Sequence, residues 1–541
     1  MKKKTSIYIT FLLFLIPLLY ATFYVPKWDS IAKDLCFEQE QRKCGTHLLD
    51  AAYLKWNDLT PSKQHFIKEE TKRPTSNELD LSLKSEHFKI HYTLKNQKHR
   101  PISPTASEAA VQDWLNDLIC YLEYSYTIFV EERHFLPPPA DYKTGGDYNL
   151  YDIYVKNLGN GTLGMTCADG PMFPDSQKAI TYMFISHEAS NTVYNHVNIL
   201  QATAQHEFFH MIQNAYYGSR LAATPNNKVK TAKSTSLREG TAVWAETIQS
   251  IYEQESIENA RYYRYLAYRP HILSHPYKHL FINEESDQSL YAYSSVFFWK
   301  YLSDQFGDAV IRKIWEKNNV QNESLSNIHF EMQALENTLK THGGLNEVIG
   351  NFFVAGSLLR SDANYTAYQK NYPKYTFKNG HRYIAYLKNE DIVPFLTPPP
   401  LTKIQNLWNS FNSEQADYFW DLQSVGGAAF YHLNAIEACS YDLRVKLPKT
   451  LFAVNVRDLK AVLVKENIEK GTLEVESATY NQQMNAANLS VHKLDNQRLN
   501  LITYRLTAPN IAVKDNAAEL RFTLEFNNMK TVCADVKALK E

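Results

Sequence analysis

Two kinds of hydrophobic periodicity follow one another in the first half of the chain. Residues 88–94 alternate between apolar and polar side chains, which predicts a β-strand. Residues 106–132 instead place apolar side chains every three or four positions, which predicts an amphipathic helix that ends before a run of three prolines. The apolar runs at 151–155 and 179–185 predict two further strands. The expected order is therefore strand, helix, strand, strand, and then another helix.

This next helix carries two histidines on its polar face. Its apolar stripe has members three or four positions apart, namely Val197, Leu200, Ala204, Phe208, Met211 and Ala215. His206 and His210 lie on the opposite side, together with Ile199, Thr203 and Gln213. Such a helix packs its stripe on a core and turns its polar face to a cleft. The order of elements predicts an α+β fold in which this helix packs beneath a mixed, twisted sheet.

Beyond residue 246 the pattern divides the chain once more. Helical spacing continues to about residue 385, which predicts a helical lobe next to the sheet. A run of three prolines at 398–400 is then typical of a stiff linker. Short alternating stretches recur after it, which predicts an all-β sandwich in residues 391–541. These stretches are residues 451–456, 461–464, 499–504 and 520–524.

Composition sets the size of the core and excludes one class of partner. With 44% hydrophobic residues among 541, the chain can bury a large core and form two or three domains. Its 57 basic and 58 acidic side chains give a formal net charge of −1. Because the sequence has neither a basic field nor a long tail of one sign, nucleic acid is not an expected partner.

Residues 1–24 indicate export. Three lysines at positions 2–4 precede an apolar run, which is the pattern of a secretory signal peptide. The residues around Ala21 form a weak cleavage site and the run approaches membrane-spanning length, so an uncleaved anchor is the alternative. Both interpretations make the rest of the chain secreted, periplasmic or exposed at the cell surface, and only the anchor brings it to a membrane. Residues 25–80 are polar with helical pieces, and they are either a propeptide or an N-terminal brace.

The six cysteines fit an oxidising compartment. Six cysteines allow fifteen pairings, and sequence alone cannot choose among them. Proximity along the chain favours Cys36 with Cys44, Cys120 with Cys167, and Cys439 with Cys533. None of these pairs has the C-x-x-C spacing of a cysteine zinc site. We therefore expect disulfide bonds rather than a cysteine metal site.

The candidate metal ligands lie in two segments. His206, Glu207 and His210 form an H-E-x-x-H motif, in which two histidines four apart on a helix reach one ion and the glutamate can take a proton from a water on it. Glu239 starts the next helical run, far enough downstream for a second helix to fold back beside the first. Two histidines and one glutamate, with water in the fourth place, make an open catalytic Zn²⁺ site. Glu246, two turns later, is either a hydrogen-bond acceptor for a ligand histidine or a solvated glutamate.

These two segments resemble the gluzincin zinc metallopeptidases, in which the third ligand is the glutamate of an E-G-x-A segment. Here that segment is Glu239-Gly240-Thr241-Ala242, and another acid follows at Glu246. The likeness is strongest to secreted bacterial metalloproteases with an H-E-F-F-H-x-x-Q helix and an E-G-T-A-x-W-x-E segment, and it covers most of residues 60–390. It implies a zinc peptidase domain in residues 81–390. The chain lacks the G-A-M-E-N segment with which gluzincin aminopeptidases hold a free amine, which favours an endopeptidase.

The same resemblance implies two further features of the site. Gluzincins commonly place a tyrosine at the start of a later helix, where its hydroxyl faces the developing oxyanion. Tyr293 is the candidate for this role, and Tyr291 is the alternative. In gluzincins the last strand before the zinc helix also runs along the cleft and pairs with extended substrates. Residues 179–184 are either that strand or an ordinary interior strand.

The leading functional hypothesis is a secreted zinc endopeptidase that acts on polypeptides. His206, His210 and Glu239 hold Zn²⁺, Glu207 is the general base, and Tyr293 helps to hold the oxyanion. A binding or adhesion protein on a metallopeptidase scaffold is the first alternative, although such descendants usually lose the general base, which this chain keeps. An exopeptidase with the same zinc site is the second. The sequence indicates no oligomeric state.

Overall fold

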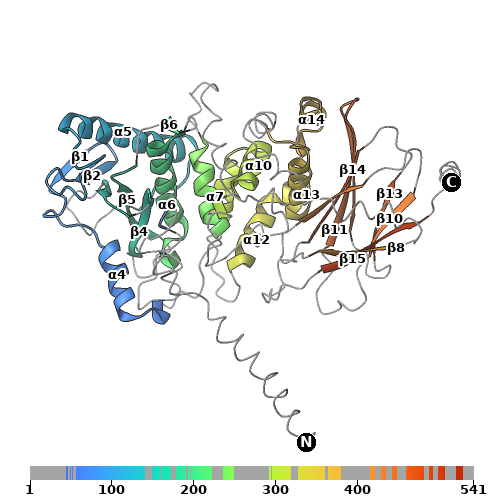
Figure 1. Ribbon diagram of the computed structural model, residues 1–541, viewed down its shortest axis with the longest axis horizontal. Helices are drawn as coiled ribbons and strands as arrows, with labels where there is room; N and C mark the ends of the chain where they lie inside the picture. The colour runs from blue at the N-terminus through green and yellow to red at the C-terminus, as the bar shows by residue number, and fades with distance from the viewer. Residues whose placement is uncertain are drawn as a thin grey trace, which may run out of the picture.

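The computed structural model describes residues 44–46, 49, 52, 56–139, 149–159, 161–171, 178–189, 193–194, 197–221, 235–248, 292–293, 295–317, 327–359, 363–378, 380, 415–420, 428–433, 441–446, 459–479, 486–491, 498–505 and 520–527. These residues form three parts that lie in a row, namely a five-stranded sheet with its helices, a group of helices, and two four-stranded sheets (Figure 1). The protein is therefore a mixture of helices and strands that contains a mixed sheet, as the sequence predicts.

The first part is a mixed sheet with the strand order β1-β2-β3-β5-β4. Its strands are β1 (Leu81–Lys84), β2 (Phe88–Tyr92), β3 (Tyr151–Lys156), β4 (Gly164–Pro171) and β5 (Ala179–Ser186). Strands β2, β3 and β5 are parallel, and the edge strands β1 and β4 are antiparallel to their neighbours. Every residue of β5 is buried, because other elements cover both faces of the sheet. The predicted strands at 88–94, 151–155 and 179–185 are confirmed, whereas β1 and β4 were not predicted.

Helices α5 (Glu108–Tyr126) and α6 (Ile199–Leu221) cover one face of this sheet (Figure 1). Helix α5 begins after the N-cap residue Ser107, whose hydroxyl accepts a hydrogen bond from the amide of Ala110. A π-helix, Thr127–Glu132, extends it to the predicted end. The apolar stripe of α5 is buried in one core cluster with residues of β2, β3 and β5. It consists of Val111, Trp114, Leu115, Leu118 and Leu122.

Residues from the N-terminal segment cover the opposite face of the sheet. The segment includes a 3₁₀-helix, Trp56–Asp58, and helix α4 (Pro61–Thr71). A second core cluster joins its apolar side chains to those of β3, β4 and β5, with the members Leu49, Ala52, Trp56, Leu59, Ile67, Leu79, Tyr154, Leu158, Met165, Cys167, Tyr182 and Phe184. Successive strand residues point to opposite faces, so Ile153 lies in the first cluster and Tyr154 in the second.

The middle part is helical. Its helices are α10 (Val296–Phe306), α11 (Ala309–Lys317), α12 (Asn327–Leu339), α13 (Gly344–Ser357) and α14 (Tyr365–Asn371), with short 3₁₀-helices at Lys340–His342 and Pro373–Tyr375. Helix α7 (Thr235–Glu246) contacts both α6 and α10, and therefore connects this part to the sheet (Figure 1). A two-stranded sheet of β6 (Val193–Tyr194) and β7 (Val197–Asn198) precedes α6. The predicted helical character up to residue 385 is confirmed for the residues that the structure describes there.

The C-terminal part consists of two antiparallel sheets with the orders β13-β10-β15-β8 and β12-β11-β14-β9. The strands are β8 (Gln415–Trp420), β9 (Ala428–Leu433), β10 (Tyr441–Lys446), β11 (Leu459–Asn467), β12 (Thr472–Thr479), β13 (Ala486–Val491), β14 (Arg498–Arg505) and β15 (Leu520–Asn527). The predicted strands at 461–464, 499–504 and 520–524 are confirmed, and the one at 451–456 lies outside the described residues.

The second of these sheets packs on the helices through a shared core. Val462, Val464, Leu473 and Ile502 belong to the same apolar cluster as the helices of the middle part. The amide of Asn364, just before α14, donates a hydrogen bond to the carbonyl of Ile468 at 3.5 Å. Within the described ranges, no helix has the length and hydrophobicity to cross a membrane. The predicted signal or anchor at 1–24 and the proline run at 398–400 lie outside those ranges.

Candidate metal centre

Helix α6 holds the two histidines of the H-E-x-x-H motif in the interior. The predicted apolar stripe of this helix lies in the core under the sheet, where Leu200, Ala204 and Phe208 are fully buried. His206 and His210 are one turn apart, so their imidazoles project from the same face of the helix. Both side chains are buried, and their Nε2 atoms are 3.1 Å apart. The structure therefore brings the two predicted ligands to one point.

Glu239 reaches the same point from helix α7. Its Oε2 atom lies 3.3 Å from Nε2 of His206 and 3.5 Å from Nε2 of His210. The next residue, Gly240, faces helix α10, and a Cβ there would collide with the hydroxyl of Ser295 and the indole of Trp299. Only glycine allows α7 and α10 to approach this closely, and that approach fixes where Glu239 points. The glycine of the E-G-x-A segment thus has a packing role.

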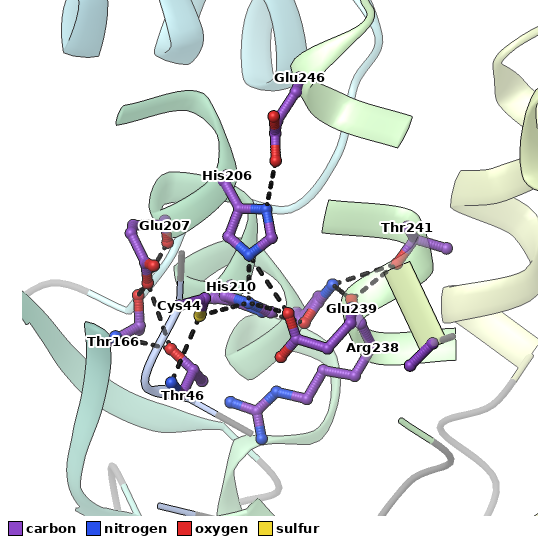
Figure 2. A network of polar contacts seen from close by, with 12 residues as sticks. Cys44, Thr46, Thr166, His206, Glu207, His210, Arg238, Glu239, Thr241 and Glu246 are labelled. Atoms are coloured by element: carbon purple, nitrogen blue, oxygen red, sulfur yellow. Dashed lines mark hydrogen bonds and ion pairs between the residues drawn. The ribbon is translucent and has the colours of Figure 1, made fainter. Parts of the chain in front are cut away.

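Hydrogen bonds fix which nitrogen of each imidazole carries the proton. Nδ1 of His206 lies 2.8 Å from Oε1 of Glu246, and a carboxylate can only accept, so Nδ1 is the donor. The amide of Gln213 donates to the carbonyl of Arg238 at 2.8 Å, which turns the oxygen of Gln213 to Nδ1 of His210 at 2.8 Å. Both Nδ1 atoms therefore carry a proton, and in the neutral imidazoles each Nε2 is left as an acceptor that faces Glu239 (Figure 2).

The converging atoms fit a metal ion. Around a tetrahedral metal with bonds of about 2.1 Å to nitrogen or oxygen and about 2.3 Å to sulfur, ligand atoms are roughly 3.4–3.6 Å apart. The three distances among His206, His210 and Glu239 are 3.1, 3.3 and 3.5 Å, and Sγ of Cys44 lies 3.5 Å from Nε2 of His210. The ligand atoms of these four residues all lie within 4.8 Å of one another. Acceptor atoms at this spacing repel one another unless a proton or a metal ion lies among them.

The electrostatics of the site also favour positive charge. Burial lowers the pKa of His206, but the carboxylates of Glu239 and Glu246 raise it to about 10 in sum. A proton or a metal ion at Nε2 of His206 would each balance the negative charge of the two carboxylates. The two compete for the same nitrogen, so metal binding requires that the proton leaves. Glu246 is 3% exposed, which excludes the solvated position that its sequence allowed.

Glu207 lies beside the metal position but does not belong to it. Its buried carboxylate turns toward β4, away from the two imidazoles (Figure 2). Oε2 accepts hydrogen bonds from the hydroxyls of Thr166 at 2.8 Å and Thr46 at 3.2 Å. A Cβ at Gly164, the first residue of β4, would lie 2.7 Å from Oε1 of Glu207. Glycine at this position therefore leaves the room that the carboxylate occupies.

The other predicted site elements have different outcomes. Tyr293 is 2% exposed and its ring centroid lies 6.0 Å from that of His206, so the structure places it beside the centre. Tyr291 lies outside the described residues. The strand at 179–184, β5, lies between β3 and β4 and is an interior strand. The edge strand next to the site is β4, so β5 cannot pair with a substrate along the cleft.

The structure brings in residues that the sequence did not assign to the site. Cys44, Thr46 and Thr166 contact His210 or Glu207, although the first was expected in a disulfide and the other two had no expected role. The only signal is the triplet Cys44-Gly45-Thr46, where a metal-binding thiol and a hydroxyl flank a residue without a side chain. Cys44 is one of four residues whose ligand atoms lie within 4.8 Å of one another, a position that the expected disulfide did not anticipate.

The predicted disulfide pairs differ from the structure as well. Cys44, Cys120 and Cys167 are free thiols. Cys120 is exposed on α5, which covers one face of the sheet, whereas Cys167 is buried in the cluster on the opposite face. The sheet itself separates the two, so proximity along the chain is misleading here. The Cys36–Cys44 pair is excluded because Cys44 is free, and the Cys439–Cys533 pair lies outside the described residues.

Comparison with known proteins leaves the site without a family. Neither a protein-family model nor a curated protein matches this chain. The likeness to gluzincins therefore stays a prediction, and a conclusion about function depends on the geometry of the site alone.

Proposed function

We propose that this protein is a secreted zinc endopeptidase of the gluzincin type. The observation that carries the proposal is the convergence of three acceptor atoms, from His206, His210 and Glu239, at the spacing of tetrahedral metal ligands. Two histidines and one glutamate are a ligand set of catalytic zinc sites. A zinc ion held by these residues supplies a Lewis acid for the scissile carbonyl and lowers the pKa of a water to about 7.

In this proposal Glu207 is the general base. Its carboxylate lies on the same helix as the two histidines but outside the group of converging ligand atoms. Thr166 holds Oε2, while Oε1 has no hydrogen-bond partner among the described residues. Oε1 can therefore take the proton of the attacking water and later deliver it to the leaving amine. The buried position keeps the carboxylate from being solvated between the two transfers.

Tyr293 is assigned to the oxyanion. It enters the site from the residues just before α10, on the side of His206. A neutral phenol that donates to the charge that develops on the scissile carbonyl contributes about 3 kcal/mol to the transition state. Glu246 and Gln213 act through the imidazoles, because they hold each Nδ1 as a donor and leave each Nε2 available.

The substrate strand in this proposal is β4. It is the edge strand next to Glu207, and an extended peptide would pair with its side away from β5, where residues 44–46 lie in this structure. Main-chain pairing of this kind places little demand on the substrate's sequence and does not need a free terminus, which favours cleavage within a polypeptide. The two C-terminal antiparallel sheets are proposed to form a β-sandwich, and residues 1–24 are proposed to direct export.

The decisive experiment compares purified wild type with Glu207→Gln. Both proteins should contain one zinc per chain, while hydrolysis of a denatured protein mixture should fall by about 10²- to 10⁴-fold in the variant, because only the proton transfer is lost. Glu188→Gln is the matched control, since Glu188 is an exposed glutamate that also follows a histidine. The proposal fails if Glu207→Gln hydrolyses at the wild-type rate or if the wild type carries no stoichiometric zinc.

A further inference from the structure

A short upstream segment, Cys44–Thr46, lies along the edge strand at the candidate metal centre. Cys44 pairs with Gly164 in a parallel bridge, and the amide of Gly45 donates to the carbonyl of Gly164 at 2.9 Å. The amide of Thr166 donates to the hydroxyl of Thr46 at 2.8 Å. The segment therefore occupies the side of β4 where an added peptide strand would pair.

Within this segment, Cys44 directs its thiol to the metal ligands. The side chain is fully buried, and Sγ lies 3.5 Å from Nε2 of His210 (Figure 2). It is one of four residues whose ligand atoms converge, and the other three are the proposed zinc ligands. Cysteine sulfur is a preferred zinc ligand, and a site with four protein ligands is closed to water and substrate.

The third residue of the segment engages the proposed general base. The hydroxyl of Thr46 donates to Oε2 of Glu207 at 3.2 Å. Cys44 and Thr46 thus contact two different parts of the reaction site at once, a metal ligand and the base. Gly45 between them passes close to β4, since a Cβ there would lie 3.2 Å from Sδ of Met165. A bulkier residue would push the segment off the strand.

The rest of the N-terminal segment is anchored to the far face of the same sheet. Trp56 and Ile67 are buried in the cluster with Tyr154 and Phe184. Arg73 ends the anchored stretch with an ion pair to Asp152 at 2.7 Å. The chain that follows residues 44–46 is therefore packed on the face of the sheet opposite α6, whereas the thiol of Cys44 lies on the α6 face, beside His210.

We propose that residues 44–46 form an autoinhibitory latch, in which the thiolate of Cys44 fills the fourth metal position and Thr46 holds Glu207. This inference rests on the proposed function, since it describes how the same site is kept closed. It assigns the described arrangement to a latent form, and displacement of the segment from β4 opens the metal, the base and the substrate edge together.

A spectroscopic test reports on the thiol without any need for catalysis. In protein loaded with Co²⁺ in place of zinc, a thiolate ligand produces a sulfur-to-cobalt charge-transfer band. We expect this band in the wild type and in Cys167→Ala, whose cysteine is equally buried but lies on the opposite face of the sheet. The band should be missing in Cys44→Ala at unchanged cobalt content. A wild type without the band, or a Cys44→Ala protein with it, overturns the latch.

A second measurement needs no variant at all. The wild-type zinc protein is exposed to a thiol-alkylating reagent with and without a chelator, and the labelled cysteines are mapped by mass spectrometry. Cys44 should be protected with zinc and become labelled after chelation, because loss of the metal lets the segment leave β4, whereas the buried Cys167 should stay protected in both conditions. Equal labelling of Cys44 in both conditions means that the metal does not hold the thiol.

Activity then separates the latch from the function on which it rests. Cys44→Ala should hydrolyse an unfolded polypeptide about tenfold faster than wild type or more, because the rate scales with the open fraction. Cys167→Ala should leave the rate unchanged, and Glu207→Gln should abolish the gain when added to Cys44→Ala. If the cobalt band is present in the wild type and lost in Cys44→Ala, but neither protein hydrolyses polypeptide, the latch is supported and the peptidase is refuted. If wild type and Cys44→Ala are equally active and neither shows the band, the peptidase is supported and the latch is refuted.

Discussion

Two polar clusters lie on opposite faces of the same sheet, and they differ in burial and in the partners of their carboxylates. On the outer face, Arg73 donates to Asp152 at 2.7 Å and to Asp169 at 2.8 Å, and His91 contacts the other oxygen of Asp152 at 2.7 Å. On the inner face, the Nε2 atoms of the two histidines and an oxygen of Glu239 converge, and all three are acceptors when the imidazoles are neutral.

The partners of the polar atoms distinguish a structural ion cluster from a candidate metal site. Both clusters contain histidine and carboxylate, so residue type alone does not distinguish them. In the Arg73 cluster the chain supplies its own cation, and donors match acceptors across every contact. In the cluster of His206, His210 and Glu239, the remaining ring nitrogens are already held as donors by Glu246 and Gln213. The proposed function places a zinc ion among these atoms.

The largest expected effect separates the two clusters by their response to metal. His210→Ala removes one of the three proposed zinc ligands, so the protein should lose stoichiometric zinc on dialysis and all measurable hydrolysis. A chelator should then lower the melting temperature of the wild type but not of His210→Ala, because only the wild type binds metal in its folded state. Metal analysis and a thermal melt give both readings.

A variant of the outer cluster is the control for this experiment. Arg73→Met should still bind one zinc and should still respond to the chelator. If Arg73→Met loses zinc as readily as His210→Ala, the two clusters are not independent and the distinction between them fails.

The next effect concerns stability. Arg73→Met leaves Asp152, whose side chain is only 8% exposed, without its guanidinium partner and with only the imidazole of His91 at 2.7 Å. Breaking a buried ion pair in this way costs about 3 kcal/mol of unfolding free energy. Arg73→Lys keeps the charge but cannot reach both aspartates in the same geometry, so its stability should fall between the two. Denaturant unfolding of the three proteins measures the series, and a Met variant as stable as wild type would contradict it.

The sequence predicts well those parts of the site that local periodicity determines. His206 and His210 were predicted to share a face because helical spacing alone dictates it, and α6 confirms this. The buried stripes of α5 and α6 follow from the same rule. Periodicity alone could not place Glu239 at the site, because its position depends on the close packing of α7 against α10 at Gly240.

The parts that were missed depend on contacts between distant segments. Cys44 meets His210 across 166 residues. Strand β4 contains glycine, aspartate and proline, which are depleted in strands, so its sequence lacks the alternation that identified β2. It forms a strand because β5 offers an unpaired edge beside it. Cysteines close in sequence were paired, but the sheet that separates Cys120 from Cys167 forms from strands that are distant in sequence.

The smallest expected effect compares how the two histidines are held. His206 donates to the charged Glu246, whereas His210 donates to the neutral Gln213 at the same distance of 2.8 Å. Glu246→Gln keeps an acceptor but removes the charge, so zinc affinity should fall only about tenfold, at the weak end of outer-shell substitutions. Glu246→Leu removes the acceptor as well and should weaken zinc further, towards a hundredfold. Competition with a chelator measures both affinities. Equal losses would show that the charge of Glu246 contributes nothing beyond its hydrogen bond, and no loss in either variant would mean that His206 is held in place without it.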